Sequence, residues 1–186
     1  TKVLARPEPV EDCAQRLASF IQRLGPLEPT WNRWHQAAAN FEKARKRQIQ
    51  PDEATLAKLM KSKAHRFMDR SSFWLGAGEN EEETSGTHGF CGSASPHSHS
   101  VCVVTTGSRG SVGERVLTAP VLTSVVRAMA LSWEPETGIA TSHAHREQIK
   151  VDQFSSPGTF VGWVMYFADF RGPVPPLPAP VQVEHI

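Results

Sequence analysis

An apolar run that leads straight into a proline-rich stretch constrains the end of this chain more than any other feature. The run TFVGWVMYF covers residues 159–167, and five prolines follow within residues 173–180. In an extended strand, neighbouring side chains face opposite ways, and here both faces are apolar. A strand covered on both faces is typical of the centre of a layered domain. The run therefore predicts a central strand over residues 160–167, with Trp163 buried in it.

The prolines of residues 173–180 have two interpretations. Each proline fixes φ and removes a backbone donor, so this stretch is held extended. It serves either as a rigid crossover between two strands or as a polyproline ligand for an SH3-like groove. We favour the crossover, because such ligands usually lie in disordered segments and this stretch adjoins an apolar strand.

Length and composition are those of one globular domain. The chain has 186 residues, of which 39% are hydrophobic and 21% charged, which suffices for one core and is short for two. We therefore expect a single domain over residues 1–186. No apolar run reaches the roughly 18 residues of a membrane span, and the start lacks the apolar core of a secretory signal. We expect a soluble cytoplasmic protein.

Helical periodicity marks the first part of the chain. Apolar residues recur at helical spacing over residues 10–24, and Gly25-Pro26 ends the run. Asp52 is the expected N-cap of a second helix that reaches about residue 63. These two segments are the clearest helices in the sequence.

Between the two helices, the structure of a tryptophan-containing segment stays open. Trp31 and Trp34 are three residues apart and would share one face of a helix, though not one face of a strand. A strand is the alternative for this segment.

From residue 71 onward, the sequence is typical of strands. Residues 72–79 and 101–106 each predict a short strand. Residues 84–100 are rich in glycine, serine and histidine and predict a mobile surface loop.

One helix interrupts these strands. GSRGSVGE predicts a turn at residues 107–114, and Val116-Leu117 a further short strand. Thr118 is then the expected N-cap of a helix with Pro120 in its first turn. Helices first and then mostly strands indicate an α+β domain, with a largely antiparallel sheet and helices packed on one side.

No residue pattern indicates an active site. The chain lacks the G-x-S-x-G elbow, the P-loop and the dinucleotide-binding glycines, so we predict no catalytic residue, no cofactor and no enzyme. The alternative is a small metal-dependent enzyme, because four residues of zinc-ligand type fall within 12 positions: Cys91, His97, His99 and Cys102. Their spacing differs from that of defined zinc sites, so we predict no metal, and these cysteines together with Cys13 are expected to be free thiols.

A nucleic-acid-binding module is a second alternative. Trp31, Arg33 and Trp34 precede a basic cluster and would form with it a basic groove with stacking aromatics; the cluster comprises Lys43, Arg45, Lys46 and Arg47. The net charge of the whole chain is only +1, without the strong positive field that such binding uses. We therefore expect no direct nucleic-acid partner and no membrane partner.

Two stretches carry a resemblance to a known family. GWVMYFADFRGPVPPLPAPVQVE, residues 162–184, resembles the C-terminal signature of the immunity protein 52 family of bacterial polymorphic toxin systems. SWEPETGIATS, residues 132–142, is similar to an internal stretch of that family. Members are encoded beside toxin genes, commonly of the restriction-endonuclease-like nuclease type delivered by type VI secretion. The resemblance implies a non-catalytic protein that binds and neutralises such a toxin, and a strand in the segment around Trp34.

The distribution of charge fits a nuclease-type partner. Residues 1–70 carry a net charge of +6 and residues 71–186 a net charge of −5. This asymmetry reflects either pairing between the two halves or a surface prepared for a charged partner. A nuclease site attracts phosphates, so carboxylates on an inhibitor would speed association. Trp133 and Phe170 are candidate aromatic anchors, unless they belong to the core. We therefore predict a partner-binding set of Glu79, Glu81, Glu82, Glu83, Trp133, Glu134 and Glu136, with a solvated acidic loop as the alternative for the first four.

Overall fold

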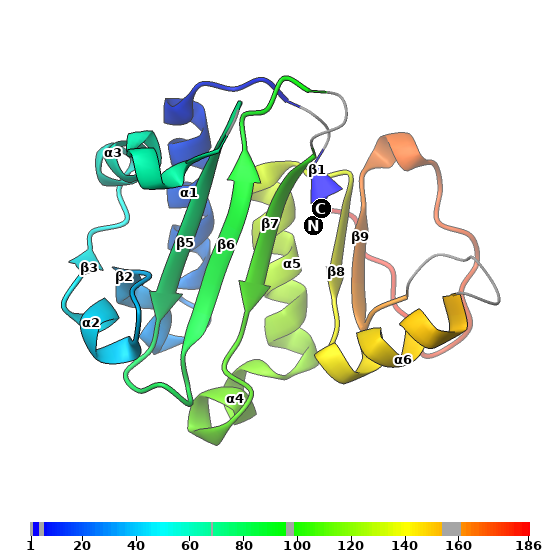
Figure 1. The fold of residues 1–186 in the computed structure, drawn as a ribbon. Helices are drawn as coiled ribbons and strands as arrows, with labels where there is room; N and C mark the ends of the chain where they lie inside the picture. The colour runs from blue at the N-terminus through cyan, green and yellow to red at the C-terminus, as the bar shows by residue number, and fades with distance from the viewer. Residues whose placement is uncertain (1, 4–5, 68, 96–98, 154–160) are drawn as a thin grey trace.

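The fold is one twisted antiparallel sheet with two long helices behind it (Figure 1). The structure is a computed structural model and describes every residue except 1, 4–5, 68, 96–98 and 154–160. Within the described residues no single helix is long and apolar enough to cross a membrane. Only the helices Gly110–Val116 and Ala119–Trp133 taken together reach that length and composition, and they are bent by 76° relative to each other.

The strands pair in the order β3-β2-β5-β6-β7-β1-β8-β9, with β4 paired separately to β5. Every pairing is antiparallel. The strands are β1 Lys2–Val3, β2 Trp34–Gln36, β3 Gln48–Ile49, β4 Arg66–Phe67, β5 Arg70–Ala77, β6 Ser85–Cys91, β7 Ser100–Thr105, β8 Thr137–Ala140 and β9 Val164–Phe167.

Two helices, α1 and α5, cover one face of this sheet (Figure 1). The helices are α1 Val10–Leu24, α2 Phe41–Arg45, α3 Glu53–Lys61, α4 Gly110–Val116, α5 Ala119–Trp133 and α6 His143–Gln153, with 3-10 turns at Pro29–Asn32, Lys63–His65 and Asp169–Arg171. The expected α+β class, with a largely antiparallel sheet and helices on one side, is confirmed.

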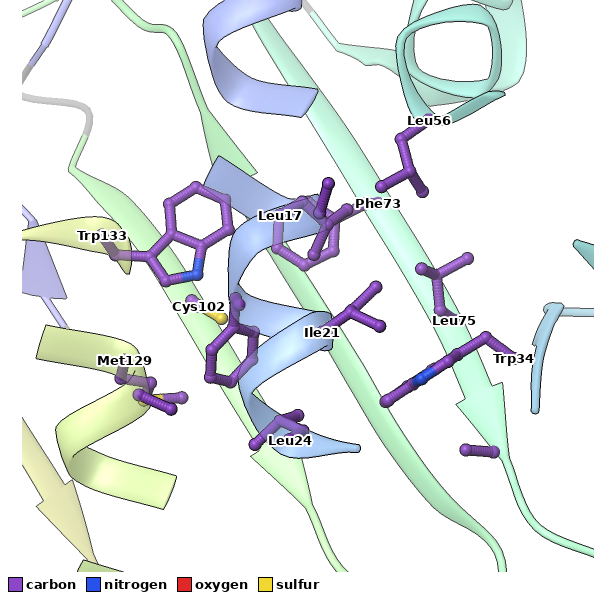
Figure 2. Close-up of a cluster of buried hydrophobic side chains, with 14 of the residues drawn as sticks. Leu17, Ile21, Leu24, Trp34, Leu56, Phe73, Leu75, Cys102, Met129 and Trp133 are labelled. Atoms are coloured by element: carbon purple, nitrogen blue, oxygen red, sulfur yellow. The ribbon is translucent and has the colours of Figure 1, made fainter. Parts of the chain in front are cut away.

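The core lies between the two helices and strands β5–β7 (Figure 2). Phe73 of β5 stacks on Trp133 of α5, with ring centroids 5.6 Å apart and planes at 12°. Gly89 of β6 lies opposite Phe73, and a Cβ on Gly89 would approach the Phe73 ring to 2.7 Å. Glycine is therefore needed at this position so that the Phe73 ring can lie flat between sheet and helix.

The helices expected from periodicity are confirmed. α1 ends at Leu24, and the carboxylate of Asp52 accepts a 2.9 Å hydrogen bond from the Thr55 amide at the start of α3. Thr118 directly precedes α5. In the open segment, Trp31 lies in a 3-10 turn and Trp34 in strand β2, and both rings are buried.

The surface loop predicted for residues 84–100 is wrong over its first half, which forms the central strand β6. All seven residues of β6 pair with β5, and five of them also pair with β7. Its small residues suit a strand enclosed by two neighbours, since Thr87 and Gly89 leave room for the core rings. The predicted turn at residues 107–114 and strand at 116–117 are also wrong, because Gly110–Val116 is helix α4.

The central strand predicted at residues 160–167 is wrong as well. β9 is the last strand of the sheet order and begins at Val164, and Trp163 is 56% exposed; residues 159 and 160 lie outside the described part. α5 packs against β9 from one face, so the apolar side chains of the other face stay accessible. Residues 173–186 are exposed and lead to no further strand in the described chain.

The different burial of Trp34 and Trp163 predicts that truncating them lowers the free energy of unfolding by different amounts. Trp34→Ala deletes a fully buried ring whose Nε1–H donates to the Trp31 carbonyl at 2.6 Å, and we expect it to lower the free energy of unfolding by about 3–5 kcal/mol. Trp163→Ala should lower it by less than about 1 kcal/mol. Urea denaturation of both variants measures the difference, and equal losses would contradict the arrangement.

Candidate functional site

The face of the sheet opposite α1 and α5 is the most distinctive surface of the molecule. In the view of Figure 1, no described helix crosses in front of β5, β6 and β7. An antiparallel sheet tolerates one solvated face, and that face is normally polar. Here it carries aromatic and aliphatic side chains.

Strand register shows which residues share this surface. Directly opposed residues of an antiparallel pair lie on the same face. Phe90 of β6 is opposite Ser72 and Val101, and His88 is opposite Trp74 and Val103. We call the surface the open face and define it by Trp74, His88, Phe90, Val101 and Val103.

The aromatic side chains of the open face are accessible. Trp74 is 61% exposed and Phe90 is 38% exposed. The Trp74 ring lies 5.4 Å from the His88 ring, and the Arg70 guanidinium lies 4.5 Å above the Phe90 ring. Partial burial lowers the pKa of His88, which favours the neutral form of its ring. The open face thus carries three aromatic rings, with the Arg70 cation above the Phe90 ring.

Apolar side chains occur again at the far edge of the sheet, beyond Lys2 of β1 and Thr137 of β8. Phe90 and Val101 belong to a row that runs through β1 to Thr137 of β8 and Phe167 of β9. Phe167 and its neighbour Ile139 are exposed. Accessible apolar patches of this kind mark interaction surfaces in soluble proteins.

Sequence reasoning missed the open face, although one signal was present. In the segment SFWL, a strand places Trp74 on the side opposite to Phe73 and Leu75. Both Phe73 and Leu75 are buried. Two large rings in adjacent positions therefore required that one of them point away from the core or into a second layer.

The acidic turn between β5 and β6 divides into paired and unpaired carboxylates. Glu79 accepts from Arg33 at 3.0 Å. Glu83 accepts from Asn80 at 2.7 Å and from Ser111 of α4 at 3.1 Å, and these hydrogen bonds lower its pKa. Glu81 and Glu82 are exposed, and neither side chain has a hydrogen bond or ion pair within the described residues. Only these two are available to a partner without breaking an internal contact.

The other predicted interface residues have structural roles. Trp133 is 3% exposed and stacked on Phe73, so its ring belongs to the core and is not available as an anchor. Glu134 follows α5 with φ 45° and binds Arg16 at 3.0 Å and Arg6 at 3.1 Å. Glu136 is buried and paired with Arg171.

The residues of the two alternative functions are not brought together. Cys91 and Cys102 are buried in the core, where hydrogen bonding to the Cys13 thiol raises the pKa of Cys91 and burial raises that of Cys102 to about 12. His97 lies outside the described residues, among which no group of three or more potential metal ligands occurs. Trp31 and Trp34 are buried and offer no stacking platform beside the basic cluster.

Comparison with known families identifies the chain. The profile of the family described as Immunity protein 52 matches residues 2–186. The chain therefore belongs to the immunity protein 52 family, and its partner is a toxin protein. No curated protein matches the sequence.

The internal role of Glu134 predicts a pH-dependent stability effect. Hydrogen bonding to Arg16 lowers the pKa of Glu134 below its usual value of about 4.5, so its contribution is present above that pH and is lost as the pH falls through the folded-state pKa. Glu134→Gln should therefore lower the melting temperature at pH 7, by an amount that shrinks toward pH 3. Glu81→Gln is the matched control and should leave the melting temperature unchanged.

Proposed function

We propose that this protein neutralises a nuclease-type, restriction-endonuclease-like toxin of a bacterial polymorphic toxin or type VI secretion system by binding it through the open face. Trp74 carries the proposal: its side chain is 61% exposed on an uncovered sheet face, with His88 directly opposite it on β6 and Phe90 two residues further along that strand. Family membership supports a toxin partner, and the open face gives that partner an apolar surface to cover.

The composition of the open face suits a protein interface. Interface hot spots are enriched in tryptophan, tyrosine and arginine and lie in the centre of the contact. Trp74 and Arg70 supply two of these residue types on one strand, and Phe90 lies between them and β7. Trp74 lies on a strand with neighbours on both sides, so binding orders little new backbone.

A nuclease-type partner is supported by charge and by the resemblance of the C-terminal signature. Glu81 and Glu82 project from the turn at the end of β5, unpaired within the described chain. A toxin whose active site attracts phosphates would be steered toward these carboxylates. Inhibition then requires one bound toxin and no chemical step on the immunity protein.

The cytoplasm is the proposed location. A nuclease-type toxin damages the nucleic acid of the cell that it enters, so its inhibitor acts where that nucleic acid is. The bound state must therefore form faster than the toxin finds its substrate, which gives exposed carboxylates a kinetic role.

The anchor role of Trp74 is tested by truncation. Trp74→Ala should raise Kd for the toxin encoded beside this gene by about 30-fold or more, as for a hot-spot aromatic residue. The matched control is Phe170→Ala, because Phe170 is 65% exposed on the 3-10 turn after β9. Isothermal titration calorimetry measures both. A larger loss for Phe170→Ala would move the interface away from the open face.

The steering role of the acidic turn is tested kinetically. Changing both Glu81 and Glu82 to Gln should slow association several-fold at low salt and flatten its salt dependence, with little change in dissociation. Stopped-flow binding at two salt concentrations measures this. Association at the parent rate would show that these carboxylates only solvate the turn.

A further inference from the structure

A polar pocket lies beside strand β2 and the turn after β5. Its volume is about 290 Å³, and its lining residues come from β2, α2, β3 and the turn after β5. They include Arg33, His35, Arg45, Gln48, Gly78 and Glu79.

His35 connects this pocket with the open face. It pairs with Gly76 of β5, which lies two residues after Trp74 and thus on the same side of the strand. The His35 ring lies directly over Gly76, because a Cβ on Gly76 would approach its Cε1 to 2.4 Å. Phe41 of α2 contacts the same ring edge-on, with centroids 5.9 Å apart.

The His35 ring lacks the hydrogen bonds that burial demands. It is only 6% exposed, and neither ring nitrogen has a well-formed hydrogen bond within the described residues, although the ring has a weak polar contact with the Gln36 backbone. A buried polar group left without a partner destabilises the folded state. Burial lowers the pKa of His35, so the neutral ring carries one N–H donor and one acceptor nitrogen. The ring is therefore prepared for a partner that enters the pocket.

The charges around His35 indicate what that partner is. Arg33 already holds a carboxylate at the pocket mouth, since Glu79 lies 3.0 Å from its guanidinium. Arg45 lies over the Phe41 ring, 5.9 Å from its centroid, and has a weak, exposed contact with Glu42 at 3.8 Å, so its guanidinium keeps donors for a ligand. A planar carboxylate matches the donor fork of arginine and accepts a further hydrogen bond from an imidazole N–H.

We propose that this pocket binds a carboxylate group between Arg45 and His35, and that an acidic side chain of the toxin supplies it. That the carboxylate comes from the toxin rests on the proposed function. That the pocket binds a carboxylate does not, because it is argued from Arg45 and His35. The toxin would then be bound by both parts: Trp74 makes the apolar contact, and the pocket binds the carboxylate.

The first experiment uses the free protein with acetate as the probe. Acetate is titrated against the protein at constant ionic strength, with chloride as the balancing anion, and the imidazole signals of His35 are followed by NMR. We expect a saturable shift that Arg45→Gln reduces at least fivefold in affinity. Arg47→Gln removes the same charge from the same basic cluster, outside the pocket lining, and should leave the titration unchanged.

Either of two results would overturn the proposed carboxylate site: a linear, non-saturating shift, or equal losses in the Arg45 and Arg47 variants, which would show general charge attraction only.

The second experiment measures Kd for the toxin. Arg45→Gln should raise it about 10-fold and Arg47→Gln less than about twofold. Saturable acetate binding together with an unchanged toxin affinity would overturn the toxin as the source and assign the pocket to a free carboxylate. The acetate titration needs no toxin, so it tests the pocket independently of the proposed function, which Trp74→Ala tests.

Discussion

The stack of Phe73 on Trp133 is the contact on which the rest of the structure depends. It joins the centre of the sheet to the end of α5, with centroids 5.6 Å apart, and Gly89 makes it possible by leaving the space beneath the Phe73 ring empty. Because α1 and α5 both pack against the face that carries Phe73, the sheet has one covered and one uncovered face. One face becomes core, and the other keeps Trp74 and Phe90 in contact with solvent.

Several opposite charges in the two halves of the chain pair with each other and join those halves. Glu28 is buried and receives two 2.8 Å hydrogen bonds from Arg115 of α4, which lower its pKa. Glu134 joins Arg6 and Arg16, and Glu79 joins Arg33. The basic first part and the acidic second part thus neutralise each other at defined points. In the acidic turn, Glu81 and Glu82 keep no internal partner among the described residues, and at the pocket beside His35 the Arg45 side chain keeps donors for a ligand.

The helices were predictable because their signals are local. Apolar spacing and a breaker define α1, and an aspartate cap defines α3. β6 was not predictable from local signals, since TSGTHGFC has the composition of a loop and becomes a strand through pairing on both sides. The central strand predicted at residues 160–167 was wrong for the opposite reason: the run is apolar on both faces, as in a central strand, yet only one face of β9 is covered. Of the predicted interface, Glu81 and Glu82 stay available, while Trp133, Glu134 and Glu136 are held in internal contacts.

The sequence by itself determined the helices with local caps and periodicity, the α+β class and, through its C-terminal motif, the family. Only the tertiary structure decided which of two adjacent rings, Phe73 or Trp74, is buried, and which carboxylates remain free. The physical reason is that burial depends on what packs against each face of the sheet. Strand alternation sorts side chains into two faces, but the positions of α1 and α5, set by contacts far apart in the chain, choose the face that becomes the core.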